Sequence, residues 1–126
     1  MDRKICLDSD ILIEILRTNQ DVKDQLSELN SNLYTTPINI FEVWGGRSKK
    51  DEEGVKKLIN SLKKIDLDEL SALKAGDMQI ELKNSGELID FRDLFIGAVC
   101  IQNNIELLTN NKKHFERLKK FGLKLV

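Results

Sequence analysis

Four oxygen-bearing side chains, well separated along this 126-residue sequence, could together bind a divalent cation. Each follows a short apolar run or lies in a helical pattern, and they are Asp8, Glu42, Asp93 and Asn111. Two carboxylates about 4 Å apart repel by roughly 4 kcal/mol at an effective dielectric near 20, so a cluster of them needs a cation or stays partly protonated. Oxygen ligands without histidine favour Mg²⁺ or Mn²⁺ over Zn²⁺, and such ions activate water and offset charge on a phosphoryl transition state.

Four further polar residues lie beside these positions: Ser9, Asp10, Asp90 and Thr109. Asp10 could join the cluster or cap the first helix, and Ser9 could also supply that cap. Asp90 stands three residues before Asp93, a spacing that lets both face one site, although capping the helix is its simpler role. Ser9 and Thr109 are expected to hold the backbone and the carboxylates in place.

The apolar periodicity predicts alternating strands and helices around these residues. Strands are expected at 4–7, 33–35, 65–67, 106–109 and 123–126. Helices are expected at 11–17, 21–29, 37–44, 51–62, 68–84, 91–101 and 112–120. This alternation indicates an α/β fold, in which a mostly parallel central sheet of four or five strands has helices on both faces. No linker or repeat interrupts the pattern, so a single domain is expected over residues 1–126.

The expected topology suggests where the oxygen-bearing side chains meet. Right-handed crossovers place the carboxyl ends of all parallel strands at one edge of a sheet, where open α/β sheets bind ligands. Asp8 and Asn111 follow predicted strands, and Glu42 and Asp93 belong to helices that could reach the same edge. The sequence permits this convergence without proving it.

Charge is segregated along the chain, although 20 Lys and Arg residues nearly balance 21 Asp and Glu residues. The segments 1–46 and 65–93 are acidic, whereas 47–64 and 107–126 are basic. Basic walls around an acidic centre would suit a metal-dependent nuclease, and the candidate RNA contacts are Arg47, Lys49, Lys50, Lys112 and Lys113. Solvated helix faces explain the same pattern, so both interpretations stay open.

Composition disfavours several classes of protein. No run approaches the roughly 18 apolar residues of a membrane span, and the first apolar run ends at Asp8, too soon for a signal peptide, so a cytoplasmic protein is expected. Cys6 and Cys100 lack the spacing of a metal motif and are expected to be small buried residues. The single histidine, His114, makes a histidine-rich zinc site implausible.

Three segments carry a family resemblance: ICLDSDILIEIL, TTPINIFEVWGG and RDLFIGAVCIQNNIELLTNNKKHF. In this order they resemble a PIN-domain ribonuclease, and the chain is most similar to small prokaryotic toxins of the VapC type. The resemblance implies a PIN-like fold and an endoribonuclease that uses Mg²⁺ or Mn²⁺ to hydrolyse RNA with a metal-activated water. It also implies a homodimer that is held inactive by a small antitoxin protein encoded beside it.

The resemblance assigns direct metal binding to Asp8 and Asp93, and metal or water binding to Glu42. The helix N-terminus is expected to favour Asp93 as the anion. Asn111 falls where the family has a fourth acid or an asparagine, and its amide offers an oxygen but no charge. Whether the site binds one or two metal ions therefore stays open.

Three further features have alternative interpretations. Phe41 and Trp44 are expected in the core or at a dimer interface, although they could stack on RNA bases. His114 stands where many relatives have an aspartate, and we expect it to be partly exposed and non-catalytic. The apolar faces of 11–16 and 51–62 are expected mainly in the core, although part of them could form a groove for an antitoxin helix.

Three other functions fit part of the sequence. A PIN-domain nuclease with a housekeeping role in RNA processing or DNA repair would look the same. A non-catalytic RNA-binding module is a further alternative, because Asn111 stands where a catalytic site would have an acid. Asp8 and Asp10 resemble the Asp-x-Asp motif of haloacid-dehalogenase phosphatases, but the chain is short for that fold and the later lysine is not evident.

Overall fold

A parallel sheet of four strands runs through the centre of the computed structural model, in the order β3-β2-β1-β4. The strands are β1 (Lys4–Leu7), β2 (Asn32–Thr35), β3 (Lys63–Lys64) and β4 (Glu106–Leu108). The structure describes residues 3–126, so Met1 and Asp2 of the predicted domain lie outside the described residues. The predicted parallel α/β architecture is confirmed.

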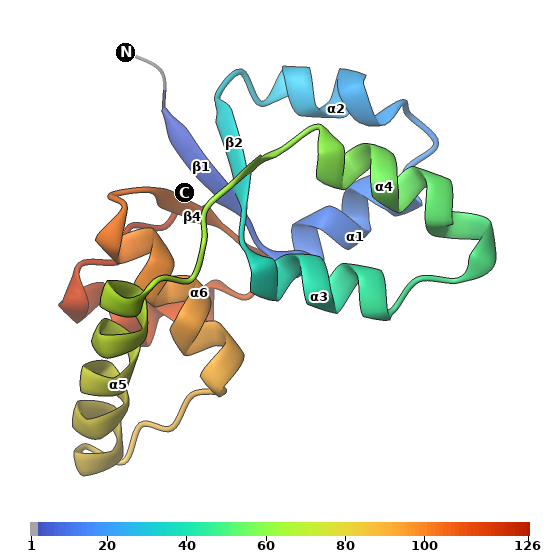
Figure 1. Ribbon diagram of the computed structural model, residues 1–126. Coiled ribbons are helices and arrows are strands. Elements are labelled where there is room, and N and C mark those ends of the chain that lie inside the picture. Colours follow the sequence, from blue (N-terminus) through green and yellow to red (C-terminus); the bar gives the residue numbers. More distant parts are fainter. Residues whose placement is uncertain (1–2) are drawn as a thin grey trace.

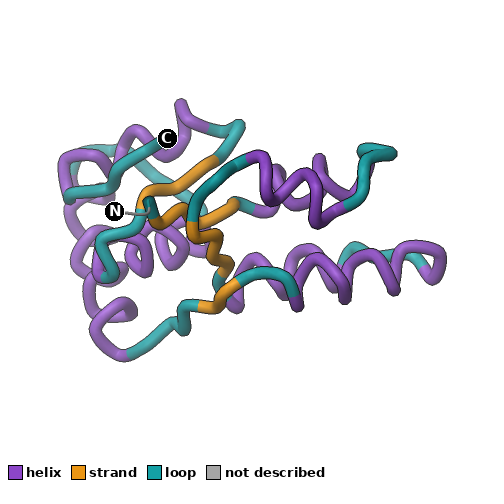
Figure 2. Tube along the Cα trace, turned by 90° about the horizontal axis from the view of Figure 1, so that it is seen from above, coloured by secondary structure: helices purple, strands orange, loops and turns teal. Residues whose placement is uncertain are grey.

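Helices connect the strands and cover both faces of the sheet. They are α1 (Ser9–Arg17), α2 (Val22–Glu28), α3 (Pro37–Gly45), α4 (Glu52–Asn60), α5 (Glu69–Asn84), α6 (Phe91–Gln102) and α7 (Lys112–Phe115), with two 3₁₀ helices, η1 (Lys49–Asp51) and η2 (Glu116–Phe121). Figure 1 shows α1 to α4 on one side of the strands and α5 and α6 on the other, and Figure 2 shows the strands between these groups. No helix within residues 3–126 is long and apolar enough to cross a membrane.

β1 shows how the sheet separates two apolar cores. Ile5 and Leu7 belong to the core formed with α1 to α4, whereas Cys6 belongs to the core formed with α5, α6 and η2. Successive side chains of a strand point to opposite faces, so a strand buried on both sides reads as a continuous apolar run. Cys6 and Cys100 are both buried free thiols, which confirms their expected role as small core residues.

The third strand lies earlier than the predicted strand 65–67. Leu62 is buried two residues after the end of α4, and the exposed Lys63 and Lys64 then pair with β2. The pairing continues for one more hydrogen bond, in which the Ile65 N–H donates to the Thr35 carbonyl at 3.0 Å. A two-residue edge strand made of lysines carries no apolar periodicity, which is why the sequence pattern missed it.

Two predictions for the C-terminal segment are wrong. The segment 123–126 makes only an isolated parallel bridge between Leu125 and Leu107, so the sheet has four strands and not five within residues 3–126. The predicted helix 112–120 is divided into α7 and the 3₁₀ helix η2. Phe115 and Leu118, three residues apart, are both buried, and this spacing matches the three residues per turn of a 3₁₀ helix.

Candidate active site

Asp8 lies at the carboxyl end of β1 and begins α1. Its Oδ1 accepts hydrogen bonds from the Ser9 N–H at 2.9 Å and from Asn39 Nδ2 at 3.3 Å, and its Oδ2 accepts from Thr109 Oγ1 at 2.7 Å. Asp8 is therefore the N-cap of α1, and the prediction that Ser9 or Asp10 supplies this cap is wrong. Only 7% of Asp8 is exposed, and burial raises its pKa although the bonds from Thr109 and Ser9 act to lower it.

Glu42 lies on α3 and is tied to Asp8 through Ser9. The Ser9 hydroxyl donates to Glu42 Oε1 at 2.7 Å and accepts a hydrogen bond from Asn39 Nδ2 at 2.9 Å. The other carboxylate oxygen of Glu42, Oε2, lies 3.7 Å from Arg92 Nη1. One carboxylate oxygen of Glu42 is thus held by Ser9, and the other faces the guanidinium of Arg92.

Asp93 lies in the first turn of α6, with its Oδ2 3.0 Å from His114 Nε2. Burial raises the pKa of Asp93 to about 6, and the negative charges of Asp8, Asp90 and Glu42 act in the same direction, whereas His114 lowers it. The net effect of burial and of the three carboxylates is thus a raised pKa, and the favourable effect of the helix N-terminus on the anion stays a prediction.

Asp90 is the N-cap of α6, in line with the simpler of its two predicted roles. Its Oδ1 accepts a hydrogen bond from the Arg92 N–H at 2.8 Å. The guanidinium of Arg92 also donates to both oxygens of Asp90, at 3.1 and 3.2 Å. These bonds lower the pKa of Asp90 and hold Arg92 beside Glu42.

The loop after β4 brings Thr109 and Asn111 to the same edge of the sheet, where it meets Asp10 of α1. Thr109 Oγ1 donates to Asp8 and accepts the Asn111 N–H at 3.0 Å. Asp10 Oδ2 accepts the Asn110 N–H at 3.1 Å and lies 3.4 Å from Thr109 Oγ1. Asp10 therefore ties α1 to the loop after β4, and Asn111 lies in that loop with its side chain exposed.

The donor chemistry of this edge fits a hard divalent ion. Asp8, Glu42 and Asp93 influence one another electrostatically, and all three offer oxygen atoms, which Mg²⁺ and Mn²⁺ prefer. Among residues 3–126, however, no three Asp, Glu, His or Cys side chains lie as a closed set of ligands.

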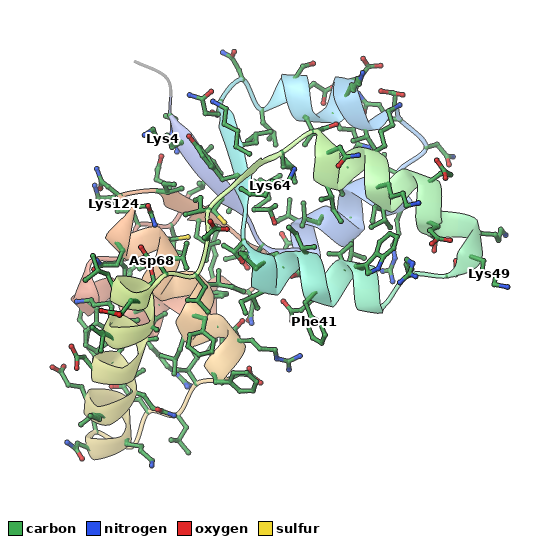
Figure 3. All side chains as sticks on the ribbon, viewed as in Figure 1. Lys4, Phe41, Lys49, Lys64, Asp68 and Lys124 are labelled. Atoms are coloured by element: carbon green, nitrogen blue, oxygen red, sulfur yellow. The ribbon has the colours of Figure 1, made fainter. Side chains whose placement is uncertain are left out.

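The predicted RNA contacts lie at different places. Arg47 is engaged by its own helix end, because its guanidinium carbon lies 3.6 Å from the Trp44 ring centre and its Nη1 donates to the Trp44 carbonyl at 2.8 Å. Lys49 and Lys50 lie in η1, at the far end of the arm formed by α3 and α4, where Figure 3 labels Lys49. Lys112 and Lys113 are exposed and directly follow Asn111.

Phe41 does not lie in the core, in contrast to one of its predicted placements. It is 68% exposed and projects from α3, next to Glu42 in the sequence (Figure 3). Trp44 is half-buried and packs against the apolar core of α1 to α4. Phe41 lies on a different face of α3 from the buried Asn39 and Val43, and the apolar periodicity of this short helix did not distinguish the two faces.

Sequence reasoning missed three contacts of the site. Asn39, which is fully buried, donates to both Asp8 and Ser9, and it could have been noticed as a polar residue one turn before Glu42. The contact of Arg92 with Glu42 was also missed, although Arg92 directly precedes Asp93 in the sequence. His114 is partly exposed as expected, but its contact with Asp93 had no signal in the sequence.

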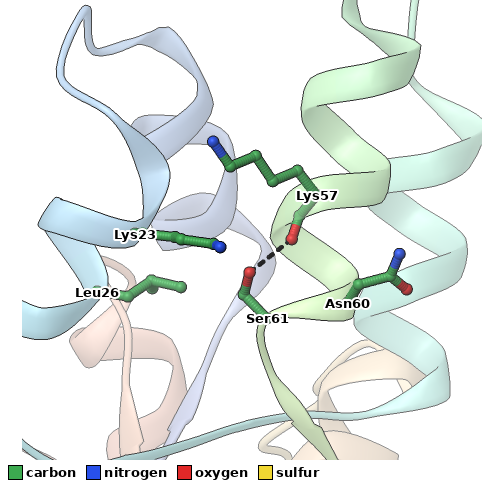
Figure 4. Close-up of a pocket in the computed structure, with 5 residues that line it drawn as sticks. All are labelled: Lys23, Leu26, Lys57, Asn60 and Ser61. Atoms are coloured by element: carbon green, nitrogen blue, oxygen red, sulfur yellow. Dashed lines mark hydrogen bonds between the residues drawn. The ribbon is translucent and has the colours of Figure 1, made fainter.

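A hollow in the surface lies away from this site. It lies between α2 and α4, has a volume of about 630 Å³, and is lined by Lys23, Leu26, Lys57, Asn60 and Ser61 (Figure 4). Within it the Ser61 hydroxyl donates to the Lys57 carbonyl at 2.7 Å, and Lys57 Nζ pairs with Asp21 at 2.9 Å. None of the predicted site residues lines it.

The sequence of residues 5–121 matches the PIN domain. The chain belongs to the PIN-domain family. This PIN domain is 36% identical over 125 residues to the Ribonuclease VapC1 of Methanocaldococcus jannaschii, with 98% of this chain and 88% of the relative covered. The predicted family and its VapC-type resemblance are confirmed.

Solved structures of similar fold come from toxin–antitoxin complexes. This PIN domain superposes with a TM-score of 0.84 on a chain of the DNA-bound VapBC from Salmonella typhimurium, at 22% identity, covering 98% of this chain and 97% of that one. The TM-score is 0.78 for the DNA-bound VapBC2 of Rickettsia felis, at 25% identity, with 97% and 96% covered. These likenesses confirm the PIN-like fold.

Proposed function

We propose that this PIN domain is a divalent-metal-dependent endoribonuclease and the toxin of a VapBC-type toxin–antitoxin pair. The relationship to Ribonuclease VapC1 over 98% of the chain supports the ribonuclease activity. The observation that carries the proposal is the gathering of carboxylates at the carboxyl edge of the sheet, where Ser9 holds Asp8 and Glu42 by hydrogen bonds of 2.9 and 2.7 Å and the charges of both act on the pKa of Asp93. Such a cluster is expected where a cation is to be bound and phosphate charge is to be met.

Each residue of the site has a distinct proposed role. Asp8, Glu42 and Asp93 would hold Mg²⁺ or Mn²⁺, and Asn111 would add an uncharged amide oxygen. When bound, the ion would supply activation of the attacking water and stabilisation of the phosphoryl transition state. The supporting residues Ser9, Asp10, Asp90 and Thr109 would fix the carboxylates and the loop after β4 through the hydrogen bonds described above.

Arg92 is the best placed candidate for a contact to an RNA phosphate. Its guanidinium lies 3.7 Å from Glu42 and its side chain is 43% exposed, so it faces both the carboxylates and solvent. An arginine can bind phosphate oxygens with two parallel hydrogen bonds. Lys112 and Lys113 would bind phosphates beside Asn111, and Arg47, Lys49 and Lys50 would meet RNA farther from the cut.

The proposed partners are a small antitoxin protein and a second copy of the chain. The VapBC complexes that share the fold support the antitoxin. Exposed large apolar side chains on α3, α5 and the approach to α6 support a homodimer, and they are Phe41, Leu70, Leu73, Ile80, Leu88 and Phe91. Because the proposed substrate is RNA, we place the activity in the cytoplasm.

Cleavage of a pool of labelled RNAs by the purified protein tests the proposed function. We expect cleavage with Mg²⁺ or Mn²⁺ and none with excess EDTA. Asp8→Asn and Asp93→Asn should each lower the rate by more than about 100-fold, the upper range for losing only an outer partner of a metal ligand. Asp77→Asn, which removes an exposed carboxylate of α5, is the matched control and should cleave at the wild-type rate.

Other outcomes would contradict the assignment. Wild-type cleavage rates in both site variants, with cleavage still dependent on the metal, would show that the site lies elsewhere. A folded protein that binds RNA and cuts no member of the pool would support the RNA-binding module instead. Cleavage without toxicity in growing cells would support a housekeeping nuclease.

A further inference from the structure

Asn39 carries a side-chain amide that is completely buried between α3, β1 and the start of α1. Its Nδ2 donates to Ser9 Oγ at 2.9 Å and to Asp8 Oδ1 at 3.3 Å, and its Oδ1 accepts from Thr36 Oγ1 at 2.7 Å. Every polar atom of this amide therefore has a partner. A buried polar network is stable only when its members are satisfied in this way.

The partners determine which way the amide faces. Thr36 Oγ1 already accepts the Asn39 N–H as the N-cap of α3, so its own proton is free for Asn39 Oδ1. An ionised carboxylate only accepts hydrogen bonds, so the amide nitrogen must face Asp8. Nδ2 then uses one hydrogen on Asp8 and the other on Ser9.

The direction of the next hydrogen bond follows. Because the Ser9 hydroxyl accepts from Asn39, its single proton is left for Glu42 Oε1, 2.7 Å away. One buried amide thus fixes an oxygen of Asp8 directly and an oxygen of Glu42 through Ser9. Asp8, directly after β1, and Glu42, on α3, are thus linked through Asn39 and also through Ser9, whose N–H donates to Asp8 Oδ1 at 2.9 Å.

We propose that Asn39 is a positioning residue that sets the relative orientation of the Asp8 and Glu42 carboxylates for metal binding. This inference rests on the proposed function, because it presumes that the two carboxylates share an ion. An apolar side chain of similar size could fill the same buried volume, so packing alone does not require an amide here. Outer partners that orient metal ligands typically raise metal affinity or activity by about 10- to 100-fold.

A calorimetric Mn²⁺ titration of the full chain tests this inference without using RNA. Asn39→Ala should bind Mn²⁺ about 10- to 100-fold more weakly than wild type. Ser9→Ala should weaken binding in the same range, and the double variant should lose little more than either single one, because all three changes break one chain of bonds. At saturating Mn²⁺ the KM for RNA should stay unchanged while kcat falls.

Asn103→Ala is the matched control. It removes an amide that donates to the Val99 carbonyl at 2.8 Å, at the far end of α6 from Asp93, and should leave Mn²⁺ affinity unchanged. Circular dichroism would confirm folding of each variant. If Asn39→Ala does not fold, Asn39→Ser takes its place in the titration, because the single proton of a hydroxyl cannot be donated to both Asp8 and Ser9.

Folded variants with wild-type Mn²⁺ affinity, or losses that simply add in the double variant, would overturn the inference and leave the proposed function intact. Weakened Mn²⁺ binding in a protein that cuts no RNA would support the inference and contradict the proposed function. Wild-type protein without Mn²⁺ binding would overturn both.

Discussion

Asp93 lies in surroundings that disfavour its charged form. Burial and neighbouring carboxylates raise its pKa from 3.8 to about 6. Between these two values the folded protein binds more protons than the unfolded chain, so the free energy of unfolding falls as the pH rises through this range. Without metal, ionised Asp93 therefore lowers the stability of the protein at neutral pH, and Asp8, whose pKa is also raised, acts in the same direction.

Asp93→Asn should stabilise the metal-free protein at pH 7 by about 1–3 kcal/mol, because it removes a charge that folding disfavours. At pH 4, where wild-type Asp93 is largely protonated, the same variant should differ little from wild type. Urea unfolding in EDTA at the two pH values measures both differences. Asp77→Asn controls for loss of a carboxylate, and equal effects of the two variants at pH 7 would contradict the argument.

The sequence predicted which oxygen-bearing residues reach the site better than it predicted what surrounds them. Asp8 and Asn111 follow strands, so the topology alone brings them to one edge. The contact between His114 and Asp93 depends on the fold of α7 and η2, which periodicity could not supply. The raised pKa of Asp93 depends on burial, which is a property of the assembled fold.

At the scale of elements, the position of α6 depends on a close approach to η2. Gly97 and Leu118 are both buried, and a Cβ added at Gly97 would lie well inside van der Waals contact of Leu118 Cδ1. Gly97 lies one turn after Asp93 on the same helix. The glycine therefore lets α6 approach η2 closely enough to keep Asp93 at the edge of the sheet.

Gly97→Ala should lower the free energy of unfolding by about 1–3 kcal/mol, because overpacking outweighs the gain in helix propensity. Gly76→Ala on α5, where an added Cβ meets nothing within 4 Å, should instead stabilise the protein by up to about 1 kcal/mol. Thermal or urea unfolding of both variants measures the contrast. Adding Leu118→Val to Gly97→Ala shortens the neighbouring side chain and should recover part of the lost free energy of unfolding. A single Gly97→Ala variant that is more stable than wild type would contradict the packing argument.

Strongly patterned elements were predictable and weakly patterned ones were not. The helix after Thr36 and Pro37 begins as predicted, since a threonine N-cap and a proline at the first helical position are direct local signals. β3 consists of two exposed lysines whose pairing is set by the neighbouring strand. No local property of Lys63 and Lys64 identifies them as a strand.

At the scale of the whole molecule, two groups of helices are packed against one sheet and leave apolar side chains exposed between and beyond them. Phe91 is 60% exposed and contacts Phe95 edge to face, with ring centres 6.0 Å apart. With Leu73 on α5, it belongs to the surface that we propose for the homodimer. Large exposed apolar patches usually mark such interfaces.

Phe91→Asp or Leu73→Asp should shift the protein from dimer to monomer, because each places a charge in an apolar contact. Light scattering coupled to size-exclusion chromatography measures the mass directly. Ile13→Asp is the control, since Ile13 is partly exposed on α1, among the other group of helices. A wild-type protein that is monomeric at about 10 µM, or a dimer that both substitutions leave intact, would contradict the proposed interface.

The pairing of β1 with β4 determines when the site can form during folding. Ile5 pairs with Glu106, and Asp8 receives its shortest hydrogen bond from Thr109. Residues about a hundred positions apart must therefore meet before the site is complete. Closing so long a loop costs chain entropy before any contact compensates for it, and parallel pairings of this kind form slowly. A chain that has folded only its first two strands and α1 to α4 therefore contains Asp8 and Glu42 but lacks Asp93, Thr109 and Asn111. The proposed toxic activity would therefore begin only once β1 has paired with β4.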